Sequence, residues 1–396
     1  MSDQNPVFIP GPTNIPDRLR LAMQMQTRDH RAPDFVDTLL PVLEGAKRVF
    51  GTSDGKVILF PASGTGGWEA AVSNTLSPGD TVLVARYGMF SHKWIDLCQR
   101  HGLDVQVIDC AWGSGAPADR FEAALSADKA HKIKAVLVTH NETATGVTSD
   151  IAGVRAAMDA ASHPALLMVD AVSSLASMPF EMDAWGVDIC VSGSQKGFML
   201  TTGMAIVAVS PKALAAMETA KLPRTFFSFA DMLALNPTGG YPYTPPLQLI
   251  YGLRESLKML EEEGLENVYA RHSRLATGVR KAVAGWGLRL VAEAPALYSD
   301  TVSAIYVPDG FDSDELTNHI FHEYGVSFGV GLGQMKGRAF RIGHLGMLTD
   351  VMVLSGLATV EMAMADLGYP VALGSGVTAA QEYFRTSRPQ KLRKAA

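Results

Sequence analysis

Short apolar segments alternate with longer amphipathic segments between about residues 57 and 210. The segments between them, such as residues 89–101 and 151–161, have the length and periodicity of helices. The apolar runs are apolar throughout, which is typical of strands covered on both faces and therefore of an α/β fold with a mostly parallel sheet flanked by helices. The predicted strands cover residues 57–60, 81–85, 105–108, 135–139, 165–169, 188–191 and 205–209.

The pattern changes after a loop rich in Pro, Gly and Tyr over residues 236–246. One long helical pattern follows over about residues 247–283, and the rest predicts a smaller α+β domain. Its strands are expected near residues 288–291, 302–306 and 339–342, and its helices near 313–324 and 349–366. We therefore predict an N-terminal segment (1–20), a large domain (21–246), a linking helix with a small C-terminal domain (247–384) and a basic tail (385–396).

Composition and charge narrow the classes of partner. The chain has 396 residues, of which 47% are hydrophobic and 19% charged, as in an ordinary globular protein. A net charge of -6 gives no general attraction to nucleic acid or to an anionic membrane. The longest regular uncharged apolar stretch, residues 197–211, is shorter than the roughly 20 residues of a membrane span. The expected partners are small molecules or other protein chains.

Cysteine content and the N-terminus predict a cytoplasmic protein. Cys98, Cys110 and Cys190 are odd in number, and no two of them have the spacing of a metal-binding or redox pair. This usage fits a reducing compartment. The N-terminus carries Asp3 and no apolar core segment, so it does not resemble a secretory signal.

A turn rich in small residues follows the first predicted strand, at residues 61–70. Free backbone N–H groups at such a strand-to-helix turn suit a phosphate, and Ser63 and Thr65 add hydroxyl donors. The turn is not a P-loop, because no Gly-Lys-Ser/Thr follows. Tight packing alone also explains a turn of this kind, so it is a weak signal by itself.

Two ionisable residues follow later strands. Asp170 comes directly after residues 165–169, and Lys196 lies in Ser192-Gly-Ser-Gln-Lys-Gly197 after residues 188–191. A lysine at a buried strand end is costly unless something uses it, and burial lowers the pKa of an amine and favours Schiff-base chemistry. For Lys196 taken alone, the alternative is a side chain that reaches solvent and pairs with an acid.

The three features together are more informative than each is alone. Pyridoxal phosphate requires a carboxylate for its ring nitrogen, an amine for its aldehyde and a cradle for its phosphate. Asp170, Lys196 and the turn at residues 61–70 supply that set, which no other common cofactor requires. The sequence therefore predicts a pyridoxal phosphate site.

Other motifs are weaker. Gly329-Val-Gly-Leu-Gly333 resembles part of a dinucleotide fingerprint, but it lacks a strand-to-helix context, so a flexible loop is favoured. His319 and His322 are spaced as two ligands on a helix, yet no further matched ligand accompanies them and a zinc site is not favoured. No Gly-x-Ser-x-Gly segment supports Ser-His-Asp chemistry.

Several segments together resemble class V (fold type I) aminotransferases. They are Ile9-Pro-Gly-Pro-Thr-Asn14, Thr139-His-Asn-Glu-Thr-Ala-Thr-Gly146, Val169-Asp-Ala-Val-Ser-Ser174, the lysine segment 192–197 and Arg341-Ile-Gly-His-Leu-Gly346. The resemblance covers nearly the whole chain. Within the family it points to the serine-glyoxylate and alanine-glyoxylate branch, and aspartate-glyoxylate transaminases are similar as well.

The resemblance implies a reaction and a set of site residues. Lys196 would bind pyridoxal phosphate covalently, Asp170 would pair with its ring nitrogen, and Arg341 would bind the substrate α-carboxylate. The amino group of a small L-amino acid, serine or aspartate, would pass to glyoxylate and give glycine with hydroxypyruvate or oxaloacetate. The catalytic residues would be Lys196 and Asp170.

The remaining implied roles concern cofactor binding in a homodimer. Ser63, Gly64, Thr65 and Gln195 would hold the phosphate, where some relatives have His in place of Thr65. Phe90 would stack on the ring, where some relatives have Trp, and Thr145 would lie near the phenolic oxygen. Tyr241 and Thr244 would reach the phosphate of the partner subunit.

Other functions stay open at this point. Besides an alanine-glyoxylate aminotransferase, a pyridoxal phosphate-dependent cysteine desulfurase or lyase fits the same cofactor, but it needs a mobile catalytic cysteine. A non-catalytic binding module would be expected to carry a signalling or nucleic-acid-binding segment. The preferred donor is also open: aspartate would need a second cation, for which Arg31, Arg86 and Arg338 are candidates.

Overall fold

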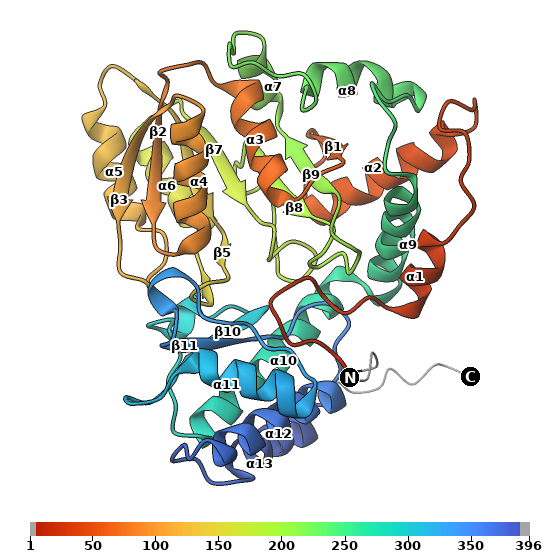
Figure 1. Cartoon of the computed structure of the whole chain (residues 1–396). Coiled ribbons are helices and arrows are strands. Elements are labelled where there is room, and N and C mark those ends of the chain that lie inside the picture. The colour runs from red at the N-terminus through yellow and green to blue at the C-terminus, as the bar shows by residue number, and fades with distance from the viewer. Residues whose placement is uncertain (1–4, 389–396) are drawn as a thin grey trace.

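The computed structural model describes residues 5–388 of the chain. Its main sheet has seven strands in the order β1-β9-β8-β7-β4-β2-β3 (Figure 1). All neighbours from β8 to β3 are parallel, and β9 alone is antiparallel to both of its neighbours, which confirms a mostly parallel sheet. The strands are β1 (Lys56–Phe60), β2 (Thr81–Arg86), β3 (Asp104–Asp109), β4 (Ile133–Thr139), β7 (Leu166–Asp170), β8 (Ile189–Gly193) and β9 (Ala205–Val209).

Helices cover both faces of this sheet, which is why its strands are apolar throughout. In β1, Val57 and Leu59 belong to one hydrophobic cluster, whereas Ile58 and Phe60 belong to another. β7, β8 and β9 are buried at every position, whereas the edge strand β3 is partly exposed. The helices of this large unit are α1 (Asp17–Met23), α2 (Val36–Phe50), α3 (Gly64–Thr75), α4 (Met89–Arg100), α5 (Ala118–Ala127), α6 (Ile151–Ala160), α7 (Pro211–Met217), α8 (Phe229–Leu235) and α9 (Leu247–Glu263).

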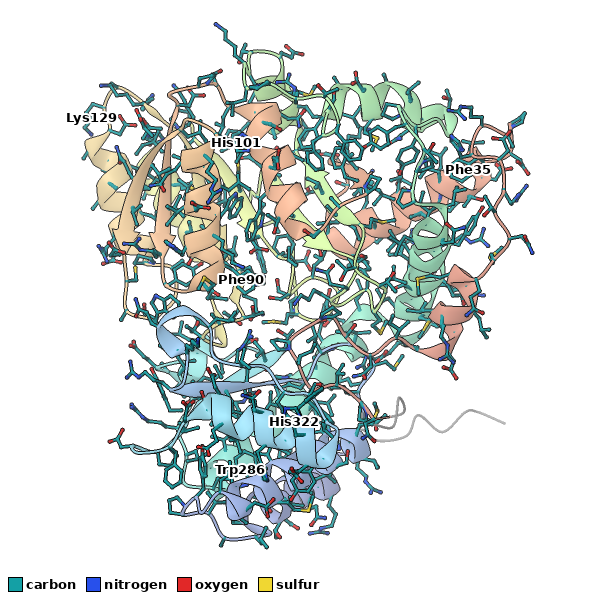
Figure 2. The ribbon with its side chains drawn as sticks, in the orientation of Figure 1. Phe35, Phe90, His101, Lys129, Trp286 and His322 are labelled. Atoms are coloured by element: carbon teal, nitrogen blue, oxygen red, sulfur yellow. The ribbon has the colours of Figure 1, made fainter. Side chains whose placement is uncertain are left out.

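A second, smaller unit lies beyond one edge of the large unit (Figure 1). Its antiparallel strands pair Ala304 with Arg341, and its core includes Phe8 from the N-terminal segment together with Trp286 and Phe340. Trp286 and His322 mark this unit in Figure 2. Its elements are α10 (Leu265–Gly285), β10 (Val302–Tyr306), α11 (Ser313–His319), β11 (Ala339–Gly343), α12 (Asp350–Asp366) and α13 (Ser375–Thr386).

Short elements complete the path of the chain. A two-stranded ribbon follows β4, and one turn of π-helix extends α11. They are β5 (Asn141–Glu142), β6 (Val147–Thr148), the π-helical turn Ile320–Tyr324 and the 3-10 turns Asn236–Thr238, Pro295–Leu297 and Gly333–Met335.

Two expectations for the second half of the chain were wrong. The single helix over residues 247–283 is two helices, because the chain turns at Gly264, whose φ of 81° ends α9. No strand covers residues 288–291, where only Leu290 forms an isolated bridge, to Ile305. α9 packs against α1 and α2, whereas α10 packs against α13. We propose that the turn between α9 and α10 joins the two units, and the boundary near residue 247 stays a prediction.

The predicted basic tail begins within a helix. Arg385 lies in the last turn of α13 and pairs with Glu382 at 2.7 Å. Lys391, Arg393 and Lys394 lie outside the described residues. None of the helices within residues 5–388 has the length and hydrophobicity of a membrane span.

Candidate active site

A cavity of about 190 Å³ lies where β7 and β8 end and where α3 and α4 begin. Seven residues that the sequence predicted for the site line it: Ser63, Gly64, Thr65, Phe90, Asp170, Gln195 and Lys196. Figure 2 shows Phe90 at the end of α4 that faces the small unit. The carboxyl ends of parallel strands therefore collect these side chains, as expected for an α/β sheet.

The N-terminus of α3 forms one wall of the cavity. Ser63 precedes the helix, whose first backbone N–H groups have no intrahelical partner. Within residues 5–388, no side chain caps them. Gly64 lets this turn approach the loop after β7, because a Cβ there would lie 2.5 Å from Cγ2 of Val172. Free N–H groups and the positive end of the helix dipole suit a phosphate at this position.

Lys196 lies on the turn after β8, and its amine points toward the N-terminal segment. Its Nζ donates a hydrogen bond to the carbonyl oxygen of Pro10. A Cβ on Gly11 would lie 2.4 Å from that Nζ, and the φ of Gly11 is 106°, so both space and backbone favour glycine here. Burial lowers the pKa of Lys196 to about 8, and the nearby charge of Arg341 acts in the same direction.

Asp170 is the last residue of β7 and is only 4% exposed. Burial raises its pKa to about 7, although the backbone N–H of Val172 donates a hydrogen bond to it at 2.9 Å. A positively charged partner in the cavity would return this carboxyl group to its ionised form. Asp170 is therefore suited to bind a protonated ring nitrogen.

One polar atom of the cavity residues, Oε1 of Gln195, is buried and has no partner within the described part of the chain. The indole N–H of Trp68 faces Asp170 and acts to lower the pKa of that carboxyl group. Buried polar groups are nearly always hydrogen-bonded, so Oε1 of Gln195 points to a bound polar molecule. An uncapped helix N-terminus, a buried amine, a buried acid and an unpartnered polar atom together fit pyridoxal phosphate.

Arg341 lies on β11 of the small unit and is 7% exposed. It does not line the cavity, although its charge lies close enough to Lys196 to lower the pKa of that amine. Its Nε donates to the carbonyl of Val330 at 2.8 Å and its Nη1 to the carbonyl of Thr143 at 3.2 Å. Within residues 5–388, no carboxylate forms an ion pair with it. Burial lowers its pKa to about 10, which leaves it charged at neutral pH. A buried guanidinium held only by carbonyls can bind a substrate carboxylate beside Thr143.

Three comparisons identify the family. The family model for Aminotransferase class-V matches residues 25–333. The chain is 62% identical over 396 residues to the L-aspartate–glyoxylate aminotransferase of Paracoccus denitrificans (strain Pd 1222), covering 100% of both. It is 56% identical over 380 residues to the serine–glyoxylate aminotransferase of Hyphomicrobium methylovorum, covering 96% of this chain and 94% of that one.

The solved pyridoxamine-pyruvate aminotransferase of Mesorhizobium loti has the same fold, with a TM-score of 0.90 and 27% identity over 98% of this chain and 99% of that one. The chain belongs to the class-V aminotransferase family. Its mostly parallel sheet flanked by helices is thus the fold of a class-V aminotransferase.

Not every residue predicted for this class-V aminotransferase site lines the cavity. Thr145 is fully buried and borders a separate small cavity with Gly146, whereas Thr143 lines the main one. The hydroxyl of Tyr241 donates a hydrogen bond to the carbonyl oxygen of Leu59 in its own chain, at 3.5 Å. Thr244 is exposed. Neither Tyr241 nor Thr244 lines the cavity of its own chain.

The cavity also contains residues that the sequence analysis missed. Trp68 lies one helical turn after Gly64, so the helical period carries it to the same wall. Val172 and Ser173 follow Asp170, and their place after a buried strand is a signal that could have found them. Asn141 and Thr143 lie within the motif at residues 139–146, but the sequence alone does not distinguish Thr143 from Thr145.

The other motifs of this class-V aminotransferase have contacts of their own within residues 5–388. His319 binds Asp366, with 2.9 Å between Nε2 and Oδ2, and His322 is exposed. Across residues 5–388, no group of three or more His, Cys, Asp or Glu could hold a metal ion. Gly329 instead pairs with the backbone of Arg341.

The cysteines do not line the cavity either. Cys98 and Cys190 are buried in α4 and β8, and Cys110 is partly buried with its Sγ 3.7 Å from Nη1 of Arg120. Burial raises the pKa of all three thiols. No mobile thiolate of the kind that a desulfurase requires lies at the site.

The lowered pKa of Lys196 gives a testable pH dependence. In the cofactor-free enzyme, covalent capture of pyridoxal phosphate should accelerate with rising pH and level off above about pH 8, because the neutral amine is the nucleophile. Visible absorbance after rapid mixing measures this rate, and a Lys196→Arg variant should form no covalent product. A rate that keeps rising up to the ordinary lysine value of 10.5 would contradict the burial of this amine.

Proposed function

We propose that this chain is a pyridoxal phosphate-dependent aminotransferase that passes the amino group of a small L-amino acid, serine or aspartate, to glyoxylate. The observation that carries the proposal is the cavity where Lys196, Asp170 and the uncapped N-terminus of α3 meet. Relatives that are 62% and 56% identical are named as glyoxylate aminotransferases, which supports the acceptor. The products would be glycine and oxaloacetate or hydroxypyruvate.

We assign the cofactor's contacts to residues that surround the cavity. Ser63, Gly64, Thr65 and Gln195 would hold the phosphate, and Phe90 would stack on the ring. When bound, pyridoxal phosphate supplies an electron sink for the charge left on the substrate's Cα. Asp170 would keep a proton on the ring nitrogen, which preserves that sink. We propose Thr143 for the contact that the resemblance had implied for Thr145, since Thr143 lines the cavity.

Lys196 and Arg341 would act on the substrate. An amine with a pKa of about 8 is partly neutral near neutral pH. Lys196 can therefore accept the proton from Cα of the donor and return a proton to Cα of the product amino acid. Arg341 would bind the α-carboxylate through two parallel hydrogen bonds and so orient the Cα–H bond toward that amine. A lysine at position 341 would provide the charge without the paired geometry.

Two observations favour different donors. Arg31 and Arg338 are exposed, and Arg86 pairs with Asp109 at 2.6 Å, so none of these arginines lines the cavity of the chain described here. Serine needs only a hydrogen-bonding partner, which this cavity offers in Asn141 and Ser173. The 62% identical relative, in contrast, is named for aspartate.

We further propose a homodimer in the cytoplasm, in which Tyr241 and Thr244 reach the phosphate in the partner subunit. Thr244 is exposed, and Tyr241 lies on the same loop. The cytoplasmic location rests on the three cysteines, none of which forms a disulfide bond within residues 5–388.

A donor panel tests the reaction. With glyoxylate as acceptor, serine or aspartate should give the highest kcat/KM, ahead of alanine and glutamate. Arg341→Lys should lower kcat/KM for that donor by about 10- to 100-fold, because one paired, charge-assisted contact is lost. Glycine formation measures both effects. Rates at background with serine and with aspartate would refute the assigned donors.

Mixed dimers test the contribution across the interface. Lys196→Ala and Tyr241→Phe/Thr244→Val chains should each have little activity alone. In mixed dimers, the second chain keeps Lys196 and receives an intact loop from the first, so random exchange should restore about a quarter of wild-type activity. The assay is run at limiting pyridoxal phosphate. No recovery despite verified subunit exchange would place these loops in their own chain's site.

A further inference from the structure

Glu142 is a fully buried carboxylate beside the active site that the mechanism above does not use. Its side chain is 0% exposed, and it does not line the cavity. Within residues 5–388, no cation forms an ion pair with it, and its oxygens accept hydrogen bonds from backbone N–H groups and one hydroxyl. Burial raises the pKa of Glu142, and the hydrogen bonds from Ser91, Ala144 and Phe90 oppose that change. A buried charge is costly, so a carboxylate held in this way calls for an explanation.

One side of Glu142 holds the start of α4. Its Oε2 accepts hydrogen bonds from the backbone N–H groups of Phe90 and Ser91, both at 3.0 Å, and from Oγ of Ser91 at 3.3 Å. Gly88 precedes α4 and has no side chain for capping. A Cβ on Gly88 would lie 2.2 Å from Cδ of Glu142, so glycine leaves the space that the carboxylate occupies. Glu142 thus caps α4 from another segment.

The other side of Glu142 holds its own turn. Oε1 accepts from the N–H of Ala144 at 3.1 Å, and the backbone carbonyl accepts from the N–H of Gly146 at 2.9 Å. Between Glu142 and Ala144 lies Thr143, which lines the cavity and whose carbonyl accepts from Nη1 of Arg341 at 3.2 Å. One carboxylate therefore fixes both the segment that carries Phe90 and the segment that holds Arg341.

Glu142 also acts on Arg341 electrostatically, without a direct contact. Burial lowers the pKa of Arg341, and the negative charge of Glu142 opposes that change. No carboxylate pairs with this guanidinium within residues 5–388. A nearby but separate negative charge helps keep Arg341 cationic, and it leaves free for a substrate those N–H groups that are not bound to Val330 and Thr143.

We propose that Glu142 is a positioning residue that fixes Phe90 relative to Arg341, and with them the ring-stacking wall relative to the carboxylate clamp. The roles of Phe90 and Arg341 in this statement rest on the proposed function. Glu142 itself touches neither substrate nor cofactor in this arrangement. It acts through the first turn of α4 and through the carbonyl of Thr143.

A double-mutant cycle with Phe90 tests the proposal. Glu142→Gln keeps the size of the side chain but turns an NH₂ group toward backbone N–H groups. The dissociation constant of the cofactor-free enzyme for pyridoxal phosphate should rise about tenfold, the size of one aromatic stacking contact. In a Phe90→Leu background, the same substitution should raise it by less than about twofold, because the contact through which Glu142 acts is already lost.

The kinetic arm uses the holoenzyme and the best donor of the panel. Glu142→Gln should lower kcat/KM by about 10- to 100-fold, since a small displacement of the carboxylate clamp misplaces the Cα–H bond. If Glu142→Gln does not fold, Glu142→Asp replaces it, because the shorter side chain keeps the charge but moves it away from α4. We then expect the same rise in the dissociation constant for pyridoxal phosphate and the same fall in kcat/KM. Glu361→Gln is the matched control.

Glu361 is 3% exposed and accepts hydrogen bonds from Nε1 of Trp286 at 2.8 Å and from the N–H of Gly376 at 2.6 Å. It caps α13 in the small unit, so its substitution should lower the melting temperature but leave cofactor affinity and KM unchanged. Equal effects from Glu361→Gln, or additive losses with Phe90→Leu, would overturn the proposal. A wild-type enzyme that binds pyridoxal phosphate without amino transfer would refute the proposed function, while the binding cycle still tests Glu142.

Discussion

Burial of opposite charges in one small region is the constraint on which the site depends. Lys196 and Asp170 lie at strand ends of the large unit, Arg341 comes from the small unit, and the charge of Glu142 acts on both Asp170 and Arg341. None of these groups is neutralised by a contact ion pair within the described residues. Each is held by backbone groups instead: Pro10 for Lys196, Val172 for Asp170 and Thr143 for Arg341. The charges are thus fixed but remain available to a ligand.

The arrangement also explains why two units are needed. The sheet supplies an amine and an acid at its carboxyl edge, but Arg341, which we propose as the carboxylate clamp, belongs to β11 of the small unit. The N-terminal segment joins them, because Phe8 packs in the small unit's core while Pro10 touches Lys196 of the large unit. Orientation of a substrate relative to the amine therefore depends on how the two units pack.

Much of this was predictable from the sequence, and the failures have physical causes. Continuous apolar runs indicate strands covered on both faces, and residues after them lie at one edge, which is how Asp170 and Lys196 could be found. A 3.6-residue period does not reveal a turn between two consecutive helices, so the break at Gly264 was missed. Thr143 and Thr145 are equivalent in one dimension, and only the turn that Glu142 fixes decides which of them faces the cavity.

The most direct measurement asks which amine carries the cofactor. The holoenzyme is reduced with borohydride, which makes a lysine–pyridoxyl link permanent, then digested and analysed by mass spectrometry. The account predicts a single pyridoxyl group, on the peptide that contains Lys196. Labelling of another lysine, with the Lys196 peptide unmodified, would contradict it.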